Sequence, residues 1–151
     1  MKIVVNANIV FSGILNTNST IADLLINSQS IFTFISPDFL QTEIRKHYHR
    51  IRVISGLTLE QIKETELQLC KDIIFVSPEQ ISQEVWIASE KLVRDIDPKD
   101  TPYIAVARHF RCTLWSGDKQ LMKGLIQKNF KDILSTADIF KLRNTLRKSI
   151  N

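Results

Sequence analysis

The feature of this 151-residue chain that most constrains its fold is an alternation of short apolar runs with longer stretches of helical periodicity. The short runs are rich in β-branched and aromatic residues, which is typical of β-strands. Strands are expected at residues 2–6, 31–36, 72–77, 111–116 and 132–135. Strands that alternate with helices of about ten residues or more indicate an α/β fold, here a three-layer α/β/α arrangement with a mainly parallel sheet of about five strands. At this length we expect a single domain over residues 1–151.

Serine and threonine residues mark where helices are expected to begin, because their side chains cap the free backbone N–H groups of a first turn. In two places a serine is followed by proline, the residue favoured at the first helical position. In another, a threonine is followed three residues later by a glutamine, the pattern of a capping box. Helices are therefore expected to start at Ser19 or Thr20, at Ser36-Pro37, at Thr58 and at Ser77-Pro78.

The composition, with 44% hydrophobic and 24% charged residues, is ordinary for a globular protein. No window approaches the roughly 18 uninterrupted apolar residues of a membrane-spanning helix, and the N-terminus lacks the pattern of a signal peptide. We therefore expect a cytoplasmic protein without a membrane association. Cys70 and Cys112 lie in different expected elements, so they are expected to be reduced thiols rather than a disulfide or a zinc pair.

The net charge is +4, and the basic residues are concentrated in two segments, 43–52 and 141–151. A basic balance favours a polyanionic partner such as RNA. Solvated helix faces explain each segment equally well when it is taken alone. The charge therefore points to a class of partner without establishing one.

Polar side chains gather where the strands of this sheet are expected to end. Asn6 and Asn8 follow the first strand, and Asp118 follows the fourth. Asp100 opens a helix, and Asp97 lies three residues before it. Taken singly, Asp100 and Asp118 are better explained as helix caps. Ligands of parallel α/β sheets bind beyond the carboxyl ends of the strands, so we expect these side chains to meet at one edge.

Glu43 is a further acid at this edge, carried by the helix after the second strand. It borders the buried face of that helix, beside Leu40 and Ile44, where a carboxylate usually has a partner or binds a metal. Carboxylates that are brought together raise one another's pKa unless a cation neutralises them. Oxygen ligands suit Mg²⁺ or Mn²⁺, and the chain has no cysteine and histidine cluster with zinc spacing.

Four blocks of the chain together resemble the PIN-domain family of nucleases, over essentially the whole length. In the family's order they are "VVNANIVFSGIL", "SPDFLQTEI", "DPKDTPYIAVA" and "LWSGDKQL". They match the family's asparagine, its glutamate and two of its aspartates with Asn8, Glu43, Asp100 and Asp118. The size and the "SGIL" and "DPKDTP" segments are most similar to toxin-type PIN proteins of bacterial toxin–antitoxin pairs.

The resemblance implies a PIN-like fold and metal-dependent hydrolysis of an RNA phosphodiester, with Mg²⁺ or Mn²⁺ as the cofactor. The residues expected to act in catalysis or to bind the metal are Asn6, Glu43, Asp97, Asp100 and Asp118, supported by Asn8 and Ser116. The residues expected to bind the RNA backbone are Arg45, Lys46 and Arg50. The fourth-strand residue Trp115 is expected in the core rather than in contact with a base.

The chain departs from the family pattern at Asn6, where the family usually has its first aspartate. An amide offers a metal one carbonyl oxygen but no charge, and it cannot act as a base, so the site should be weakened. Three explanations remain open: an engineered inactive variant, a naturally impaired nuclease, or an active one in which Asp97 or another acid compensates.

The toxin-type resemblance also implies a small antitoxin protein as partner and a homodimer. Leu57, Leu59 and Ile62 are apolar residues that could lack a partner in a monomer. One alternative is a catalytically silent protein of PIN fold that binds RNA or an antitoxin. Another is a small signalling domain that binds Mg²⁺ through its acids, but the paired acids and the lysine of receiver-type domains are missing from their expected places.

Overall fold

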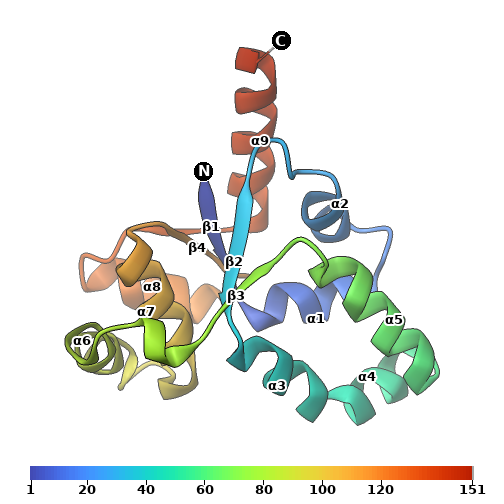
Figure 1. Cartoon of the computed structure of the whole chain (residues 1–151), viewed down its shortest axis with the longest axis horizontal. Helices are drawn as coiled ribbons and strands as arrows, with labels where there is room; N and C mark the ends of the chain where they lie inside the picture. The colour runs from blue at the N-terminus through green and yellow to red at the C-terminus, as the bar shows by residue number, and fades with distance from the viewer. Residues whose placement is uncertain (151) are drawn as a thin grey trace.

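The computed structural model describes residues 1–150 and contains a five-stranded sheet in which all neighbouring strands are parallel. The strands are Lys2–Val5 (β1), Thr33–Pro37 (β2), Ile74–Val76 (β3), Thr113–Trp115 (β4) and Ile133–Leu134 (β5). Their order in the sheet is β3-β2-β1-β4-β5, with β1 at the centre (Figure 1). The predicted α/β/α fold with a parallel sheet of about five strands is confirmed.

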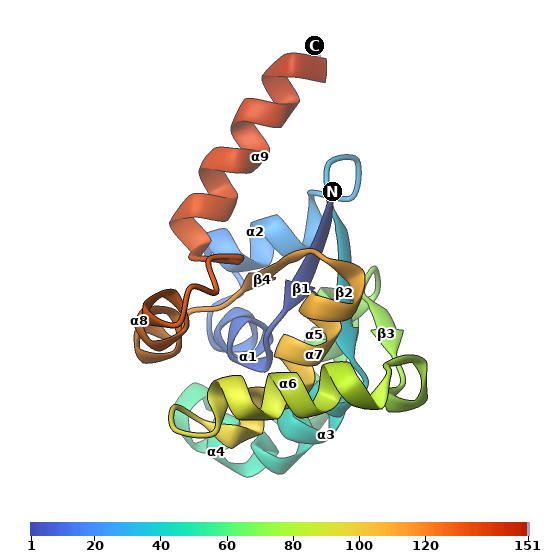
Figure 2. The same ribbon diagram turned by 90° about the vertical axis from the view of Figure 1, so that its left-hand side faces the viewer.

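Helices cover both faces of the sheet. They are α1 (Ala7–Leu15), α2 (Thr20–Ile26), α3 (Phe39–Lys46), α4 (Tyr48–Ser55), α5 (Leu59–Cys70), α6 (Gln83–Val93), α7 (Thr101–Phe110), α8 (Lys119–Gln127) and α9 (Thr136–Ile150), with short 3₁₀ turns η1 (Pro78–Gln80) and η2 (Pro98–Asp100). α7 packs on β1, β2 and β4 from one face, and α6 packs on α7. α1, α2 and α5 lie on the other face (Figure 1). Figure 2 shows α9 extending away from the sheet beyond α2.

The central strand β1 is apolar on both of its faces because helices cover both sides of the sheet. Ile3, Val4 and Val5 are fully buried, as expected for the middle strand of a parallel sheet. Trp115 of β4 is also fully buried, and its ring lies 5.8 Å from that of Phe34, so its predicted place in the core is confirmed. This rigid centre positions the residues that follow β1 and β4.

The helix expected at Ser36-Pro37 does not begin there, because both residues belong to β2. Ser36 is buried, and its hydroxyl donates a hydrogen bond of 2.8 Å to the carbonyl of Val5 in the neighbouring strand. α3 begins after Asp38 instead, and the chain turns at His47 into the separate helix α4. The serine hydroxyl found its acceptor in the adjacent strand rather than capping a helix.

The serine and proline at positions 77 and 78 also start no long helix; the proline begins only the short turn η1. α6 begins five residues after this proline, capped by Ser82. The capping box at Thr58 is confirmed, with its hydroxyl oxygen accepting from the Gln61 backbone N–H at 3.1 Å. The predicted cap at Ser19 is confirmed as well.

Among residues 1–150, no single helix is both long and apolar enough to cross a membrane. α1 and α2 satisfy that length and composition only as a pair bent by 113°.

Candidate active site

A cleft of about 240 Å³ lies at the carboxyl edge of the sheet, beside the ends of β1 and β4. The structure brings five of the residues predicted from the sequence into the lining of this cleft: Asn6, Glu43, Asp97, Asp100 and Asp118. They come from five places in the chain, namely the end of β1, α3, the residue before η2, the end of η2 and the residue before α8. The parallel topology therefore assembles what is far apart in the sequence.

Asn6 is buried, with 4% of its surface exposed, and both ends of its side-chain amide are engaged. Its oxygen Oδ1 accepts a hydrogen bond of 3.2 Å from the backbone N–H of Asn8 and so caps α1. Its nitrogen Nδ2 donates a hydrogen bond of 3.4 Å to Oδ1 of Asp100. Asn6 thus starts a helix that the sequence analysis missed and also contacts an acid of the cleft.

Asp100 is buried, but it is not the ordinary helix cap that its position before α7 suggested. It stands at the N-cap position of α7, yet its side chain makes no capping hydrogen bond. The pKa of its carboxyl is raised from 3.8 to about 7, mainly by burial and next by the negative charge of Asp97. The hydrogen bond from Asn6 acts in the opposite direction, while Asp118 and Glu43 add smaller increases to the pKa.

Asp118 does cap a helix: its Oδ1 accepts a hydrogen bond of 3.1 Å from the Leu121 backbone N–H at the start of α8. The hydroxyl oxygen of Ser116 holds the loop before it, accepting from the Asp118 backbone N–H at 3.1 Å and from Nδ2 of Asn8 at 3.3 Å. The Asn8 Oδ1 in turn accepts from the Gly117 backbone N–H at 3.2 Å. Asn8 and Ser116 therefore tie the start of α1 to the loop that carries Asp118.

Glu43 is half-buried, and the hydroxyl of Tyr103 donates a hydrogen bond of 2.7 Å to its Oε1. Burial raises the pKa of Glu43, and the hydrogen bond from Tyr103 opposes that rise. Tyr103 itself is fully buried on α7, and burial raises the pKa of its hydroxyl far above the ordinary value. The sequence analysis missed Tyr103; its place one helical turn after Asp100 is the signal that could have identified it.

The predicted RNA-binding residues do not share one surface. Arg50 lines the cleft, together with His47 and Phe11. Lys46 is exposed and lies over the ring of Phe39, 5.9 Å from its centre, outside the cleft. Arg45 lines a different hollow altogether.

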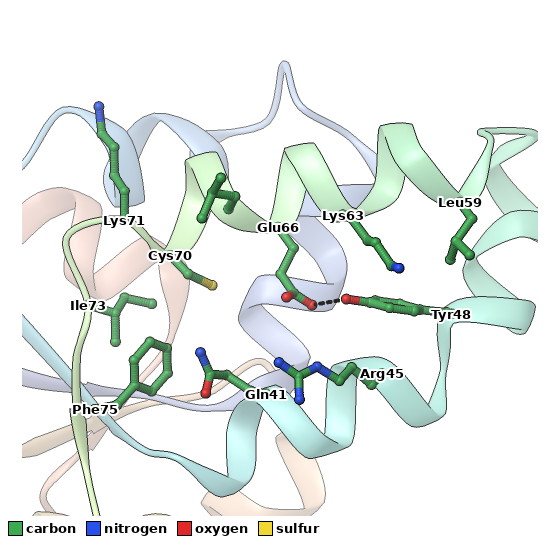
Figure 3. Close-up of a pocket in the computed structure, with 11 residues that line it drawn as sticks. Gln41, Arg45, Tyr48, Leu59, Lys63, Glu66, Cys70, Lys71, Ile73 and Phe75 are labelled. Carbon is green, nitrogen blue, oxygen red and sulfur yellow. Dashed lines mark hydrogen bonds between the residues drawn. The ribbon is translucent and has the colours of Figure 1, made fainter.

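This second hollow is a groove of about 900 Å³ between α3, α4, α5 and β3 (Figure 3). At its centre the hydroxyl of Tyr48 donates a hydrogen bond of 2.9 Å to Glu66. Burial raises the pKa of Tyr48 to about 12, with Glu66 contributing, and burial also raises the pKa of the Cys70 thiol to about 12. α3 separates the two hollows, since it presents Glu43 to the cleft and Arg45 to the groove.

The cleft offers a cation mainly oxygen ligands, from four carboxylates and the Asn6 amide, and one imidazole, from His47. This donor chemistry fits Mg²⁺ or Mn²⁺, and Mg²⁺ commonly binds through one or two carboxylates while keeping several waters. Within residues 1–150, no three His, Cys, Asp or Glu side chains are arranged closely enough to hold a metal ion directly. The ligand atoms are therefore of the kind that Mg²⁺ or Mn²⁺ binds. Because position 6 is a neutral asparagine, the cleft has one negative charge fewer than the family pattern.

Among known protein families, a family model described as "PIN domain" matches residues 4–138. This range includes every residue of the cleft described above. No curated protein matches the chain by sequence.

Proposed function

The chain belongs to the PIN-domain family, whose members are generally nucleases, and on that premise we propose that it is a metal-dependent endoribonuclease. The observation that carries the proposal is the meeting of Glu43, Asp97, Asp100 and Asp118 in one cleft. Burial and mutual repulsion raise the pKa of Asp100 to about 7, which marks a cluster of acids whose charge calls for a cation.

One or two of Asp100, Asp118 and Glu43 would contact the ion directly and the others would bind its waters, with Asp97 at the rim of the cleft. A bound Mg²⁺ or Mn²⁺ would supply an activated water and stabilise the charge that develops on the phosphate. Tyr103 orients Glu43 through its hydrogen bond, and Ser116 fixes the loop that carries Asp118. Arg50 brings a positive charge to the cleft, where it can contact the RNA backbone.

Asn6 should reduce this activity, because it replaces a carboxylate with a neutral amide whose Nδ2–H faces Asp100. A second candidate function rests on the same observation: a catalytically silent protein of PIN fold that binds RNA or a protein partner. The two candidates differ in one property, since the first cleaves RNA at a low rate and the second does not cleave it at all.

Cleavage of a labelled single-stranded RNA with Mn²⁺, or with EDTA in its place, tests the proposal. We expect slow cleavage by the unmodified protein, faster cleavage by Asn6→Asp, and none by the double variant Asn6→Asp/Asp118→Asn. EDTA should stop all cleavage. Equal rates for the unmodified protein and Asn6→Asp would show that Asn6 does not stand in for a missing carboxylate. No cleavage by either protein would favour the silent alternative.

We further propose that the chain is the cytoplasmic toxin of a toxin–antitoxin pair, as its toxin-type sequence suggests. A small antitoxin would insert a basic or bulky side chain into the acidic cleft. Expression of Asn6→Asp in bacteria should slow growth, and Asn6→Asp/Asp118→Asn should not. Equal growth with both variants would contradict the toxin role.

We also propose a homodimer, but the expectation that Ile62 lacks a partner in a monomer is wrong, because Ile62 is fully buried in the core. Leu57 is half-buried and Leu59 is 37% exposed, so these two residues remain available. Light scattering at high micromolar concentration should give twice the monomer mass, and a monomer would contradict the proposal.

A further inference from the structure

We infer that Phe11 is a stacking site for one unpaired nucleobase, and that Arg50 holds a phosphate next to that base. The inference rests on the proposed function and specifies its substrate: a single-stranded nucleic acid that is gripped through both a base and its backbone. It adds to the acid cluster a binding position on α1, a helix that was not expected from the sequence.

Phe11 lies in the wall of the acidic cleft and is only half-buried. Two exposed residues flank its ring: Arg50 of α4 and His47, the residue just before α4. The guanidinium carbon of Arg50 is 5.8 Å from the centre of the ring, and the His47 ring meets it edge-on, with centres 6.0 Å apart and planes at 82°. An aromatic ring beside a cation is therefore held at the same cleft as Asp100 and Asp118.

Packing explains only the buried part of Phe11. A half-exposed aromatic ring beside four carboxylates is out of place in a cleft that binds nothing but a hydrated ion. The cleft repels a polyanion, and Arg50 is the one lysine or arginine that lines it within residues 1–150. Binding a nucleic acid here therefore needs a second source of affinity, and stacking on an aromatic ring provides one that every base can use.

The arrangement selects unpaired nucleotides. A base within a duplex is already stacked and presents no free face, whereas the bases of a single strand can lie on an aromatic side chain. The Arg50 guanidinium lies over the Phe11 ring, so a base can stack on that ring when the guanidinium moves aside to a neighbouring phosphate. The phosphodiester is thereby placed in the cleft whose lining includes Asp100 and Asp118.

The chain contains a matched control for this pair. Phe39 on α3 is also half-buried and also carries a cation over its ring, with the Lys46 amine 5.9 Å from the ring centre. Neither residue lines the cleft. A change at Phe39 therefore reproduces the loss of an aromatic ring beside a cation without touching the inferred site.

The test compares two labelled 12-nucleotide probes by fluorescence anisotropy in EDTA: a mixed-sequence RNA and an abasic ribose-phosphate chain of equal length. Phe11→Leu should weaken binding of the RNA by about tenfold, within the range for one stacked base, and leave the abasic chain unaffected. Phe11→Tyr should bind the RNA normally. Arg50→Gln should weaken both probes, and Phe39→Leu should change neither by a comparable factor.

The outcomes separate the inference from the function on which it rests. If the unmodified protein binds RNA and Phe11→Leu binds it equally well, or loses both probes alike, the stacking site is wrong and the nuclease proposal stands. If the unmodified protein binds neither probe, the inference fails, and the nuclease proposal is decided by the cleavage assay with Mn²⁺. Circular dichroism of Phe11→Leu shows whether a loss of binding is caused by unfolding. In that case Phe11→Tyr decides: if it prefers the RNA to the abasic chain as strongly as the unmodified protein does, the inference is supported. If Phe11→Tyr has lost that preference, the inference is overturned.

Discussion

The side-chain nitrogen of Asn6 donates a hydrogen bond to Oδ1 of Asp100 at a distance of 3.4 Å. This contact joins the end of the central strand to the most buried acid of the cleft, and it is a contact that an aspartate at position 6 could not make in its ionised form. The amide therefore has two effects. It gives the acid cluster one negative charge fewer than an aspartate would, and it donates a hydrogen bond to the carboxylate of Asp100.

The buried acid Asp100 should make the stability of the metal-free protein depend on pH. Its pKa rises on folding from 3.8 to about 7, mainly through burial, so the folded state binds this proton more tightly than the unfolded state. The contribution of protonated Asp100 to the free energy of unfolding is complete below pH 3.8 and is lost as the pH rises through 7. With about 1.4 kcal/mol per pKa unit, the loss is at most about 4 kcal/mol.

Urea unfolding between pH 4 and 8 in EDTA measures this dependence. The unmodified protein should lose stability across the range relative to Asp100→Asn, whose profile should be flatter. Asp97→Asn removes the neighbour whose charge raises the pKa of Asp100 most. The decrease in stability of this variant with rising pH should therefore end at a lower pH than that of the unmodified protein. Parallel profiles for the unmodified protein and Asp100→Asn would show that Asp100 is not the source of the pH dependence.

Tyr103→Phe should raise the pKa of Glu43 further, because the hydroxyl that donates to Glu43 at 2.7 Å lowers it. The variant should also lose about 1–3 kcal/mol of stability at neutral pH, since a partly buried carboxylate oxygen loses its donor. Carboxyl ¹³C NMR titration reports the pKa. Phe39→Leu is the packing control, because it removes a ring 6.4 Å from that of Tyr103 but no hydroxyl. An unchanged pKa of Glu43 in Tyr103→Phe would show that the Tyr103 hydroxyl makes no hydrogen bond to Glu43 that affects its ionisation.

Arg143 fastens α9 to α2, and Arg143→Met should cost roughly 1 kcal/mol of unfolding free energy at neutral pH. Its Nη2 donates to Asp23 at 2.7 Å and its Nη1 to Ser28 at 3.2 Å. The cost is small because 44% of the Asp23 side chain is exposed and because Nε of Arg143 is buried without a hydrogen-bond partner within residues 1–150.

The effect of Arg143→Met should disappear in acid. The hydrogen bond from Arg143 lowers the pKa of Asp23, so the contribution is present above the unfolded pKa of 3.8 and is lost as the pH falls through the lower, folded value. Thermal unfolding at pH 7 and pH 2.5 tests this, with Lys148→Met as an exposed control. A difference from the unmodified protein that persists unchanged at pH 2.5 would rule out the ion pair as its cause.

Much of the fold followed from patterns that depend on neighbours in sequence. The capping box at Thr58 and the cap at Asp118 satisfy backbone N–H groups within one turn, so local sequence was sufficient. The apolar run of β1 was recognisable because a central parallel strand is buried on both faces. The order of the strand ends then placed Asp100 beside Asn6.

The errors arose where a side chain had a partner far away in the sequence. Ser36 bonds to the neighbouring strand instead of capping a helix. Arg45 was grouped with Arg50, but the two lie on different helices, α3 and α4, which the turn at His47 sends in different directions. Tyr103 was missed because its role depends on Glu43, which is 60 residues away.

The central claim is that the cleft is a divalent-cation site weakened by the amide at position 6. Calorimetric titration of Mn²⁺ into the unmodified protein and into Asn6→Asp tests it most directly, because aspartate also caps helices and should preserve α1. The added carboxylate should contribute roughly 1.5–3 kcal/mol, or about one to two decades in affinity. The gain should disappear in Asn6→Asp/Asp100→Asn. Equal Mn²⁺ affinity in the unmodified protein and Asn6→Asp, or a gain that survives the loss of Asp100, would contradict the account.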